Sequence, residues 1–255
     1  MALSPSLCVS VSPCLCGEVS ALKPQRDGDT ETYRGQTPMQ LTNILFDLDG
    51  TLTDPAEGIV RCIQHSLTTL NIDCPAPEEL TRYIGPPLRE VFVSVCNSSD
   101  AHLVERAVEV FRERFSTIGL FENTPYADVS QMLTELSSKS YRLFVATSKP
   151  QVFAEKILRH FSLADHFVEI QGNDLEGRLD DKAELLKELL ERRELRVEET
   201  IMVGDRKHDV IAAKRNGVMS LGVTYGYGTK AELVEAGVDY LCHSPLEVAS
   251  QIMKL

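Results

Sequence analysis

Short apolar runs alternate with amphipathic segments along the chain from residue 43 onward. The runs are Ile44–Phe46, Leu143–Ala146, Phe167–Val168, Ile201–Val203 and Leu221–Val223. Short apolar strands separated by helices are typical of a parallel sheet that helices cover on both faces. The pattern therefore predicts an α/β fold with a doubly wound, mainly parallel sheet.

The alternation is interrupted after the first run, because the next strand is expected only at Leu143. In between, apolar residues recur at helical spacing over residues 59–70 and 103–115, and prolines mark the connections. A helix over about residues 126–138 is expected to lead back into the sheet. We therefore predict an inserted, all-helical module above the carboxyl edge of the first strand, which is the edge where open α/β sheets bind ligands.

These features divide the chain into three parts. Residues 1–38 show neither strand nor helix periodicity and are expected to be a disordered extension without the pattern of a signal peptide. Residues 39–54 and 126–255 are expected to form the sheet domain, and residues 55–125 the helical insertion.

Composition narrows the classes of partner. The chain has 26 Lys and Arg against 38 Asp and Glu, a formal net charge of -12. This balance offers no basic stripe for nucleic acid and no polybasic cluster for a membrane surface. The cysteines, 7 in number, lack zinc-type pairing and are expected to be reduced thiols. We expect a soluble, cytoplasmic protein; the oligomeric state is left open.

Two aspartates follow the first predicted strand. Residues 47–53 read DLDGTLT, so that Asp47 and Asp49 lie two positions apart and Gly50 allows the chain to turn. Acids in this arrangement can serve as a nucleophile and as a proton donor to the leaving group. Taken alone, Asp49-Gly50 is more typical of an ordinary turn.

Two further signals are weak individually. Thr147 and Ser148 follow the second strand, where a hydroxyl and free helix amides can hold phosphate oxygens, although a simple helix cap explains them as well. Lys182 precedes a helix expected over residues 183–191, and it could place a positive charge near a transferring phosphoryl group or be solvated.

The fourth motif reads IMVGDRKHD over residues 201–209 and places Asp205 and Asp209 one helical turn apart beside a strand end. Carboxylates at this spacing suit a hard cation, and they also complement a helix dipole. Because all four motifs end strands of one sheet, we expect them to meet in one crevice. Clustered carboxylates repel each other by ~4 kcal/mol per close pair at intermediate dielectric, so we predict a bound dication, Mg²⁺ by its preference for oxygen ligands.

At this point the motifs resemble the haloacid dehalogenase (HAD) superfamily, and FDLDGTL over residues 46–52 matches its first motif closely. The resemblance covers about residues 42–253 and implies a Rossmann-like core. The helical insertion is similar to the cap of the phosphoglycolate phosphatase and β-phosphoglucomutase branch. The segment IGPPL over residues 84–88 looks like a cap loop of the phosphoglycolate phosphatase-like members.

The resemblance implies a phosphatase that forms a phosphoaspartate. Asp47 is the implied nucleophile, and Asp49 the implied acid and base. Mg²⁺ would be held by Asp47, the Asp49 carbonyl and Asp205, with Asp209 as an orienting or outer-shell acid. The implied groups around the substrate are Thr147, Ser148, Lys182, Thr51 and Arg89.

Several alternatives stay open. Beside a phosphatase for a small, phosphoglycolate-like monoester, the chain could be a 5′-nucleotidase or a phosphomutase of the β-phosphoglucomutase type. Non-enzymatic readings are a receiver-like phosphoacceptor and a protein that only binds phosphorylated ligands. Arg89 could meet substrate or pair on the surface. Arg206 and Lys207 could add positive potential to the crevice, although both are expected to be solvated on a helix. The glycine-rich stretch at residues 225–228 receives no assigned role.

Overall fold

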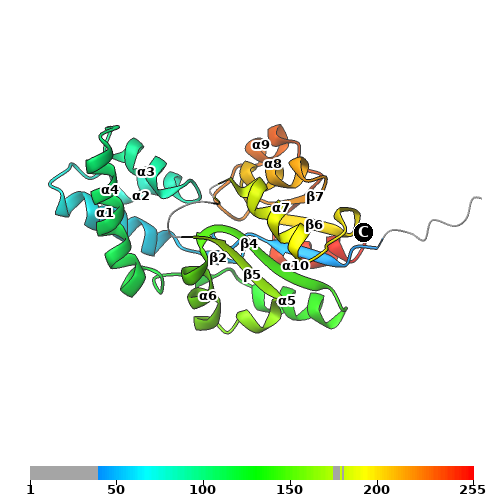
Figure 1. Ribbon diagram of the computed structural model, residues 1–255. Coiled ribbons are helices and arrows are strands. Elements are labelled where there is room, and N and C mark those ends of the chain that lie inside the picture. The colour runs from blue at the N-terminus through cyan, green and yellow to red at the C-terminus, as the bar shows by residue number, and fades with distance from the viewer. Residues whose placement is uncertain (1–39, 175–178, 180) are drawn as a thin grey trace, which may run out of the picture. The chain divides into compact units, whose positions relative to one another are not determined.

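A computed structural model describes residues 40–174, 179 and 181–255 of the protein. The extension over residues 1–38, which was predicted to be disordered, lies outside the described residues. Within the described part, the main sheet has 6 strands, all parallel, in the order β5-β4-β1-β6-β7-β8 (Figure 1). The strands are β1 (Asn43–Phe46), β4 (Arg142–Pro150), β5 (Glu169–Asn173), β6 (Thr200–Gly204), β7 (Met219–Val223) and β8 (Tyr240–Cys242). The predicted doubly wound α/β fold is thus confirmed.

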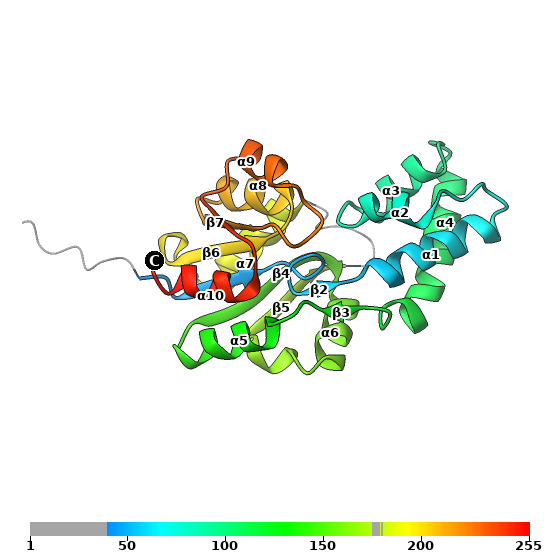
Figure 2. The ribbon, with the colours of Figure 1, turned by 180° about the vertical axis from the view of Figure 1, so that it is seen from behind.

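Alternate side chains of β1 enter the two halves of the core. Leu45 belongs to an apolar cluster shared with α7 (Lys182–Arg192) and α8 (Lys207–Arg215). Ile44 and Phe46 belong to a second cluster, which also contains residues of the segment 55–125 and of three helices that follow it in the chain. These helices are α5 (Val129–Ser138), α6 (Gln151–His160) and α10 (Pro245–Ile252). Opposite faces of the sheet are therefore covered by different helices, as Figure 2 shows from behind.

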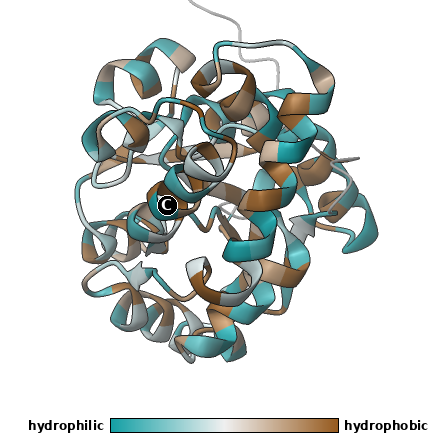
Figure 3. Ribbon diagram, turned by 90° about the vertical axis from the view of Figure 1, so that its left-hand side faces the viewer, coloured by the Kyte–Doolittle hydropathy of each residue, from teal (hydrophilic) through white to brown (hydrophobic). Residues whose placement is uncertain are grey.

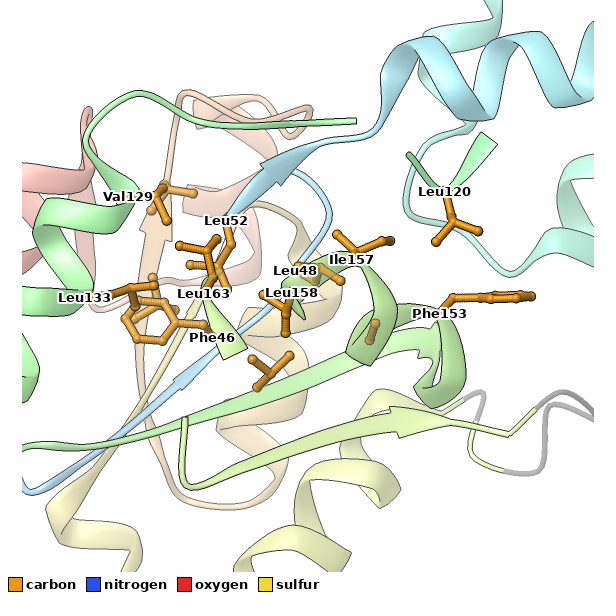
Figure 4. Close-up of a cluster of buried hydrophobic side chains, with 14 of the residues drawn as sticks. Phe46, Leu48, Leu52, Leu120, Val129, Leu133, Phe153, Ile157, Leu158 and Leu163 are labelled. Carbon is orange, nitrogen blue, oxygen red and sulfur yellow. The ribbon is translucent and has the colours of Figure 1, made fainter. Parts of the chain in front are cut away.

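In the second cluster, Phe46 lies close to side chains from α5 and α6 (Figure 4). The helices around it are amphipathic, and in Figure 3 individual helices carry both hydrophilic and hydrophobic stretches. A further helix, α9 (Lys230–Ala236), lies between β7 and β8 in the chain. In the sheet, β1 lies between β4 and β6. Because these three strands are parallel, the loops that follow them lie at the same edge of the sheet.

The segment over residues 55–125, which we call the helical insertion, follows β1 and the loop that carries Asp47 and Asp49. Its entry and exit strands, β2 (Thr53–Asp54) and β3 (Thr124–Pro125), pair antiparallel. Between them lie α1 (Ala56–Thr69), α2 (Pro77–Leu80), η1 (Thr81–Tyr83), α3 (Leu88–Val95), α4 (Ala101–Arg114) and the π-helical turn η2 (Phe115–Gly119). Because β2 and β3 pair, the two chain segments that connect the insertion to the sheet domain lie side by side.

The sequence missed or misplaced some elements. The strand predicted at Phe167–Val168 was wrong: η3 (Ala164–His166) precedes this position, Val168 is 50% exposed, and the strand begins at Glu169. The helix expected from residue 126 starts only at Val129, because Asp128 has a left-handed backbone with φ 66°. The short strand β8 was not expected. In the first two cases a turn overrode the apolar pattern, whereas β8 is only 3 residues long.

Among the residues that the structure describes, none of the helices combines the length and the apolar character needed to cross a bilayer. The described cysteines, Cys62, Cys74, Cys96 and Cys242, all carry free thiols.

Candidate active site

The loop after β1 carries two partly exposed carboxylates at the edge of the sheet, and a leucine between them is buried in the core. Leu48 is completely buried, whereas the side chains of its neighbours Asp47 and Asp49 keep some exposure. Gly50 turns the chain with φ 82°, and a Cβ at this position would lie 2.2 Å from Asp205 Oδ2. The glycine is therefore required both for the backbone angle and for the close approach of the two loops.

Three of the predicted acids lie together. Asp47, Asp205 and Asp209 each offer a carboxylate oxygen, and these oxygens all lie within 4.8 Å of one another. Lys182, the first residue of α7, places its Nζ 2.8 Å from Asp47 Oδ2 and forms a second ion pair with Asp209. The structure thus brings four of the predicted residues into one cluster, whose spacing is suited to a single cation.

The charges of this cluster are only partly balanced. Burial, together with the negative charges of Asp209 and Asp47, raises the pKa of Asp205 to about 7. Burial also raises the pKa of Asp209 to about 6, against the opposing effect of Lys182. For Lys182, burial disfavours the charged form, but Asp209 and Asp47 outweigh it and raise its pKa above the ordinary value. One lysine therefore does not compensate three clustered carboxylates, two of which are buried.

The hydrogen bonding of Asp205 also indicates an excess of negative charge in the cluster. Among the described residues, Asp205 Oδ1 is buried and has no hydrogen-bond partner. A buried carboxylate oxygen without a donor is costly, so it needs either a proton or a cation. The residues present therefore fit a divalent metal ion.

Asp49 has a different environment from the other acids. Its Oδ2 lies 2.5 Å from Nζ of Lys149, a nearly buried lysine near the end of β4. Burial raises the pKa of Asp49, Lys149 opposes this, and the charge of Asp47 adds to it. The structure thus separates two roles that lie two residues apart in sequence: Asp47 belongs to the acidic cluster, and Asp49 has its own cation.

Lys149 is a site residue that the sequence reasoning did not single out, although it directly follows the Thr147-Ser148 pair. Thr147 is buried, and its Oγ1 accepts a hydrogen bond from the Lys149 amide at 3.3 Å. Both Thr147 and Ser148 line a pocket, which we call the acid pocket, together with Asp47, Asp49 and Lys182. The hydroxyl pair therefore lies beside the two acids, but it belongs to β4, which continues to Pro150 and does not end before Thr147 as predicted.

Two other residues expected to contact substrate, Thr51 and Arg89, lie outside the lining of the acid pocket. Thr51 is buried in the turn after Gly50, outside the residues that line the acid pocket, and its carbonyl accepts a hydrogen bond from the Tyr225 hydroxyl. Arg89 is half-exposed and pairs with Glu105 on the neighbouring helix α4, with Nε 2.6 Å from Oε1. Arg89 also lines a second pocket, which adjoins the acid pocket and is described below, so the ion pair with Glu105 leaves both readings of Arg89 open.

The glycine-rich stretch at residues 225–228 acquires a structural role. Its Gly226 and Gly228 lie so close to Asp205 that a Cβ would come within 2.5 Å of Asp205 Cβ or 1.8 Å of its carbonyl oxygen. This approach brings the amide of Tyr227 to Asp205 Oδ2 at 2.8 Å. The loop therefore orients one acid of the cluster.

Arg206 is not solvated, so that expectation was wrong. Its side chain is 17% exposed, its Nε donates to Glu232 Oε1 at 2.9 Å, and its Nη1 donates to the Ile84 carbonyl at 2.8 Å. The side chain of Lys207 is exposed, as expected. The sequence could not reveal the difference, because Ile84 and Glu232 are both distant in the chain.

A second, more apolar chamber, open to solvent, adjoins the acid pocket and shares Asp49, Ser148 and Lys149 with it. Most of its remaining wall comes from the helical insertion. The apolar members of the wall are Ile59, Ile63, Tyr83, Leu88, Val91, Phe111 and Phe115 from the insertion, with Phe153 from α6. The wall also contains the charged side chains of Arg89 and Arg112. The part of a substrate that lies beside Asp49 is therefore expected to extend into a mainly apolar space.

This sheet edge, with its acids and helical insertion, is that of the haloacid dehalogenase-like hydrolases. The model of this family matches residues 44–223, and the chain belongs to the family. The resemblance seen in the motifs is confirmed.

Relatives of the chain include phosphatases. It is 46% identical over 195 residues to a 5′-nucleotidase of Pseudomonas aeruginosa, covering 76% of this chain and 88% of that protein. It is 32% identical over 184 residues to a phosphoglycolate phosphatase of Aquifex aeolicus, covering 72% of this chain and 85% of the relative. Among solved structures, a predicted phosphatase from Clostridium acetobutylicum is similar with a TM-score of 0.81 and 39% identity, covering 85% of this chain and 100% of that one. These relatives confirm the prediction of a phosphatase of this family.

Proposed function

We propose that the protein hydrolyses small phosphomonoesters, with Asp47 as the nucleophile and Asp49 as the acid and base. The observation that carries this assignment is the separation of the two carboxylates: Asp47 lies with Asp205, Asp209 and Lys182, while Asp49 is paired with Lys149. A nucleophile must stay ionised, whereas a proton donor needs a raised pKa, which Asp49 has.

The chemistry then takes two steps. A carboxylate oxygen of Asp47 attacks phosphorus, the bond from phosphorus to the ester oxygen breaks, and Asp49 gives its proton to the departing alkoxide. In the second step Asp49 removes a proton from water as the water oxygen attacks phosphorus, and the bond from phosphorus to the Asp47 carboxylate oxygen breaks. Inorganic phosphate leaves, and the Asp47 carboxylate is restored. Thr147, Ser148 and Lys182 hold the phosphoryl oxygens throughout, since positioning and charge neutralisation are what phosphoryl transfer requires.

Mg²⁺ is the proposed cofactor. Asp47, Asp205 and the Asp49 backbone carbonyl would hold it, with Asp209 orienting the set; the buried, unpartnered Asp205 Oδ1 supports this assignment within the described residues. When bound, the cation supplies the positive charge that lets an anionic phosphate approach clustered carboxylates.

The raised pKa values predict how pH affects stability without metal. Asp205 and Asp209, with pKa values of about 7 and about 6, hold protons in the folded state that the unfolded chain releases near pH 4. Their contribution to folding stability is therefore present below about pH 4 and is lost as pH rises through 6 and 7. Mg²⁺ offsets the remaining repulsion, so we expect it to raise Tm more at pH 8 than at pH 5.

Thermal unfolding with and without Mg²⁺ at the two pH values measures this difference. Asp205→Asn is the comparison, because it removes the charge while keeping the shape, and its Tm should respond little to Mg²⁺ at either pH. An equal Mg²⁺ effect at pH 5 and pH 8 in the wild-type protein would count against the assignment.

Between the two expected substrate classes, the apolar chamber favours a nucleoside monophosphate over phosphoglycolate. Glycolate is small and charged, and would leave the aliphatic and aromatic wall beside Asp49 without a partner. A nucleoside could place its flat base against that wall. The 5′-nucleotidase relative, at 46% identity, supports the same choice.

We expect nucleoside 5′-monophosphates to have a higher kcat/KM than phosphoglycolate in a panel that also contains sugar phosphates. Ile59→Ala removes apolar wall from the chamber, so it should raise KM for the best nucleotide about 5-fold, equivalent to about 1 kcal/mol of lost contact. Its effect on phosphoglycolate should be small. Steady-state phosphate release measures both.

Ile118→Ala is the matched control, because Ile118 also belongs to the insertion but is 53% exposed and lies outside the chamber wall. Preferred turnover of phosphoglycolate, with Ile59→Ala and Ile118→Ala behaving alike, would reject the nucleotide assignment while leaving the phosphatase assignment intact.

A further inference from the structure

Backbone amides of two residues hold the two carboxylates on the β6 side of the acidic cluster. The Arg206 amide donates to Asp209 Oδ2 at 3.0 Å, and the Tyr227 amide donates to Asp205 Oδ2 at 2.8 Å. Each acid is thus oriented by a residue whose side chain remains available for another contact. Both of these side chains contact the helical insertion or its entry.

Arg206 reaches the loop between η1 and α3. Its Nη1 donates to the carbonyl of Ile84, a fully buried residue of that loop, at 2.8 Å. Its guanidinium is held in place from the other side by Glu232 of α9. Because the guanidinium is planar and held at two points, a shift of the loop acts directly on the residue that orients Asp209.

Tyr227 reaches the entry to the insertion. Its hydroxyl donates a hydrogen bond to Asp54 Oδ1, at the end of β2. The same Asp54 oxygen accepts from the amide of Ala56, the first residue of α1, at 3.0 Å. The residue that orients Asp205 is therefore tied to the point where the insertion leaves the sheet domain.

We propose that Arg206 and Tyr227 are positioning residues that couple cation binding in the acidic cluster to the placement of the helical insertion. The proposal rests on the function proposed above, because it takes the cluster to be the cation site. Each contact joins the two parts through a single residue, so fixing the carboxylates favours one position of the insertion. By linkage, fixing the insertion favours cation binding to the same extent.

Neighbouring residues provide controls with the same chemistry but without the connection. The Tyr225 hydroxyl donates to the Thr51 carbonyl, which belongs to the sheet-domain turn. The side chain of Lys207 is exposed beside Arg206. Tyr225→Phe therefore matches Tyr227→Phe, and Lys207→Met matches Arg206→Met, while all four variants keep the backbone amides.

The experiment uses the full chain, freed of metal with chelator. Isothermal titration gives the Kd for Mg²⁺, and deuterium exchange is measured with chelator and with saturating Mg²⁺. In the wild-type protein we expect Mg²⁺ to slow exchange over residues 84–91 and 56–60. Arg206→Met should lose this effect over residues 84–91, and Tyr227→Phe over residues 56–60.

Both variants should also bind Mg²⁺ about 5-fold more weakly, the lower end of typical coupling between sites. Tyr225→Phe and Lys207→Met should match the wild-type protein in both measurements. Arg206→Lys keeps the charge and one donor, and it is the control for a folding defect in Arg206→Met. Its Kd and its protection should lie between those of the wild-type protein and those of Arg206→Met. A role limited to stability would lower Tm without changing the Mg²⁺-dependent part of the exchange.

Wild-type Kd values and unchanged Mg²⁺-dependent protection in Arg206→Met and Tyr227→Phe would overturn the coupling while leaving the proposed function intact. Absence of Mg²⁺ binding to the wild-type protein would instead overturn the cation assignment, and the coupling with it.

Discussion

Asp47→Asn is expected to reduce kcat for phosphomonoester hydrolysis by at least about 1,000-fold, because the variant lacks the nucleophile on which both steps depend. The amide keeps the size of the carboxylate, and it still has Leu48 and Lys182 as neighbours. Loss of activity should therefore reflect chemistry and not folding. Phosphate release under saturating Mg²⁺ measures the rate, and thermal unfolding verifies the fold.

Asp128→Asn is the matched control for this change. Asp128 is exposed at the start of α5, makes no side-chain cap hydrogen bond, and has a left-handed backbone that Asn adopts readily. Its activity should equal that of the wild-type protein. Full activity in Asp47→Asn would show that Asp47 is not the nucleophile.

Asp49→Asn is expected to lower kcat for alkyl phosphates by about 100-fold or more, the usual contribution of a positioned proton donor. The loss in the first step should be much smaller for p-nitrophenyl phosphate, whose leaving group departs without a proton. Rapid-quench measurement of leaving-group release separates this step from the hydrolysis of the intermediate. The comparison of the two substrates makes the test specific to proton transfer.

Lys149→Met complements that variant, because Lys149 is the cation paired with Asp49. If Lys149 acts through Asp49, the double variant should lose little more activity than Asp49→Asn alone. An Asp49→Asn effect of equal size on both leaving groups in the first step would show that Asp49 is not the proton donor.

The convergence of Asp47, Thr147, Lys182 and Asp205 could be expected from the sequence, since each lies at or just beyond the end of a strand or at the start of a helix. Apolar runs identify such strands, and parallel strands of one sheet end at the same edge. Where a strand lacks an apolar run, the reasoning fails: β5 reads EIQGN and was placed two residues early. Its polar residues at positions 171 and 173 are buried at the sheet edge.

Contacts between distant segments could not be expected in this way. Arg206 and Ile84 are 122 positions apart, and Tyr227 and Asp54 are 173 apart. An arginine within a motif is usually solvated, and only the placement of the insertion gives this one an acceptor. Lys149 is similar, because a lysine near the end of β4 pairs with Asp49 only when β1 and β4 are neighbours.

The central claim is that Asp47 forms a covalent bond to phosphorus. The most direct test mixes Asp49→Asn with p-nitrophenyl phosphate and Mg²⁺, quenches in acid, and locates any added phosphoryl group by peptide mass spectrometry. We predict one phosphoryl group on Asp47, absent when chelator replaces Mg²⁺ and absent in Asp47→Asn. Leaving-group release without a phosphorylated peptide, or phosphorylation at another residue, would contradict the account.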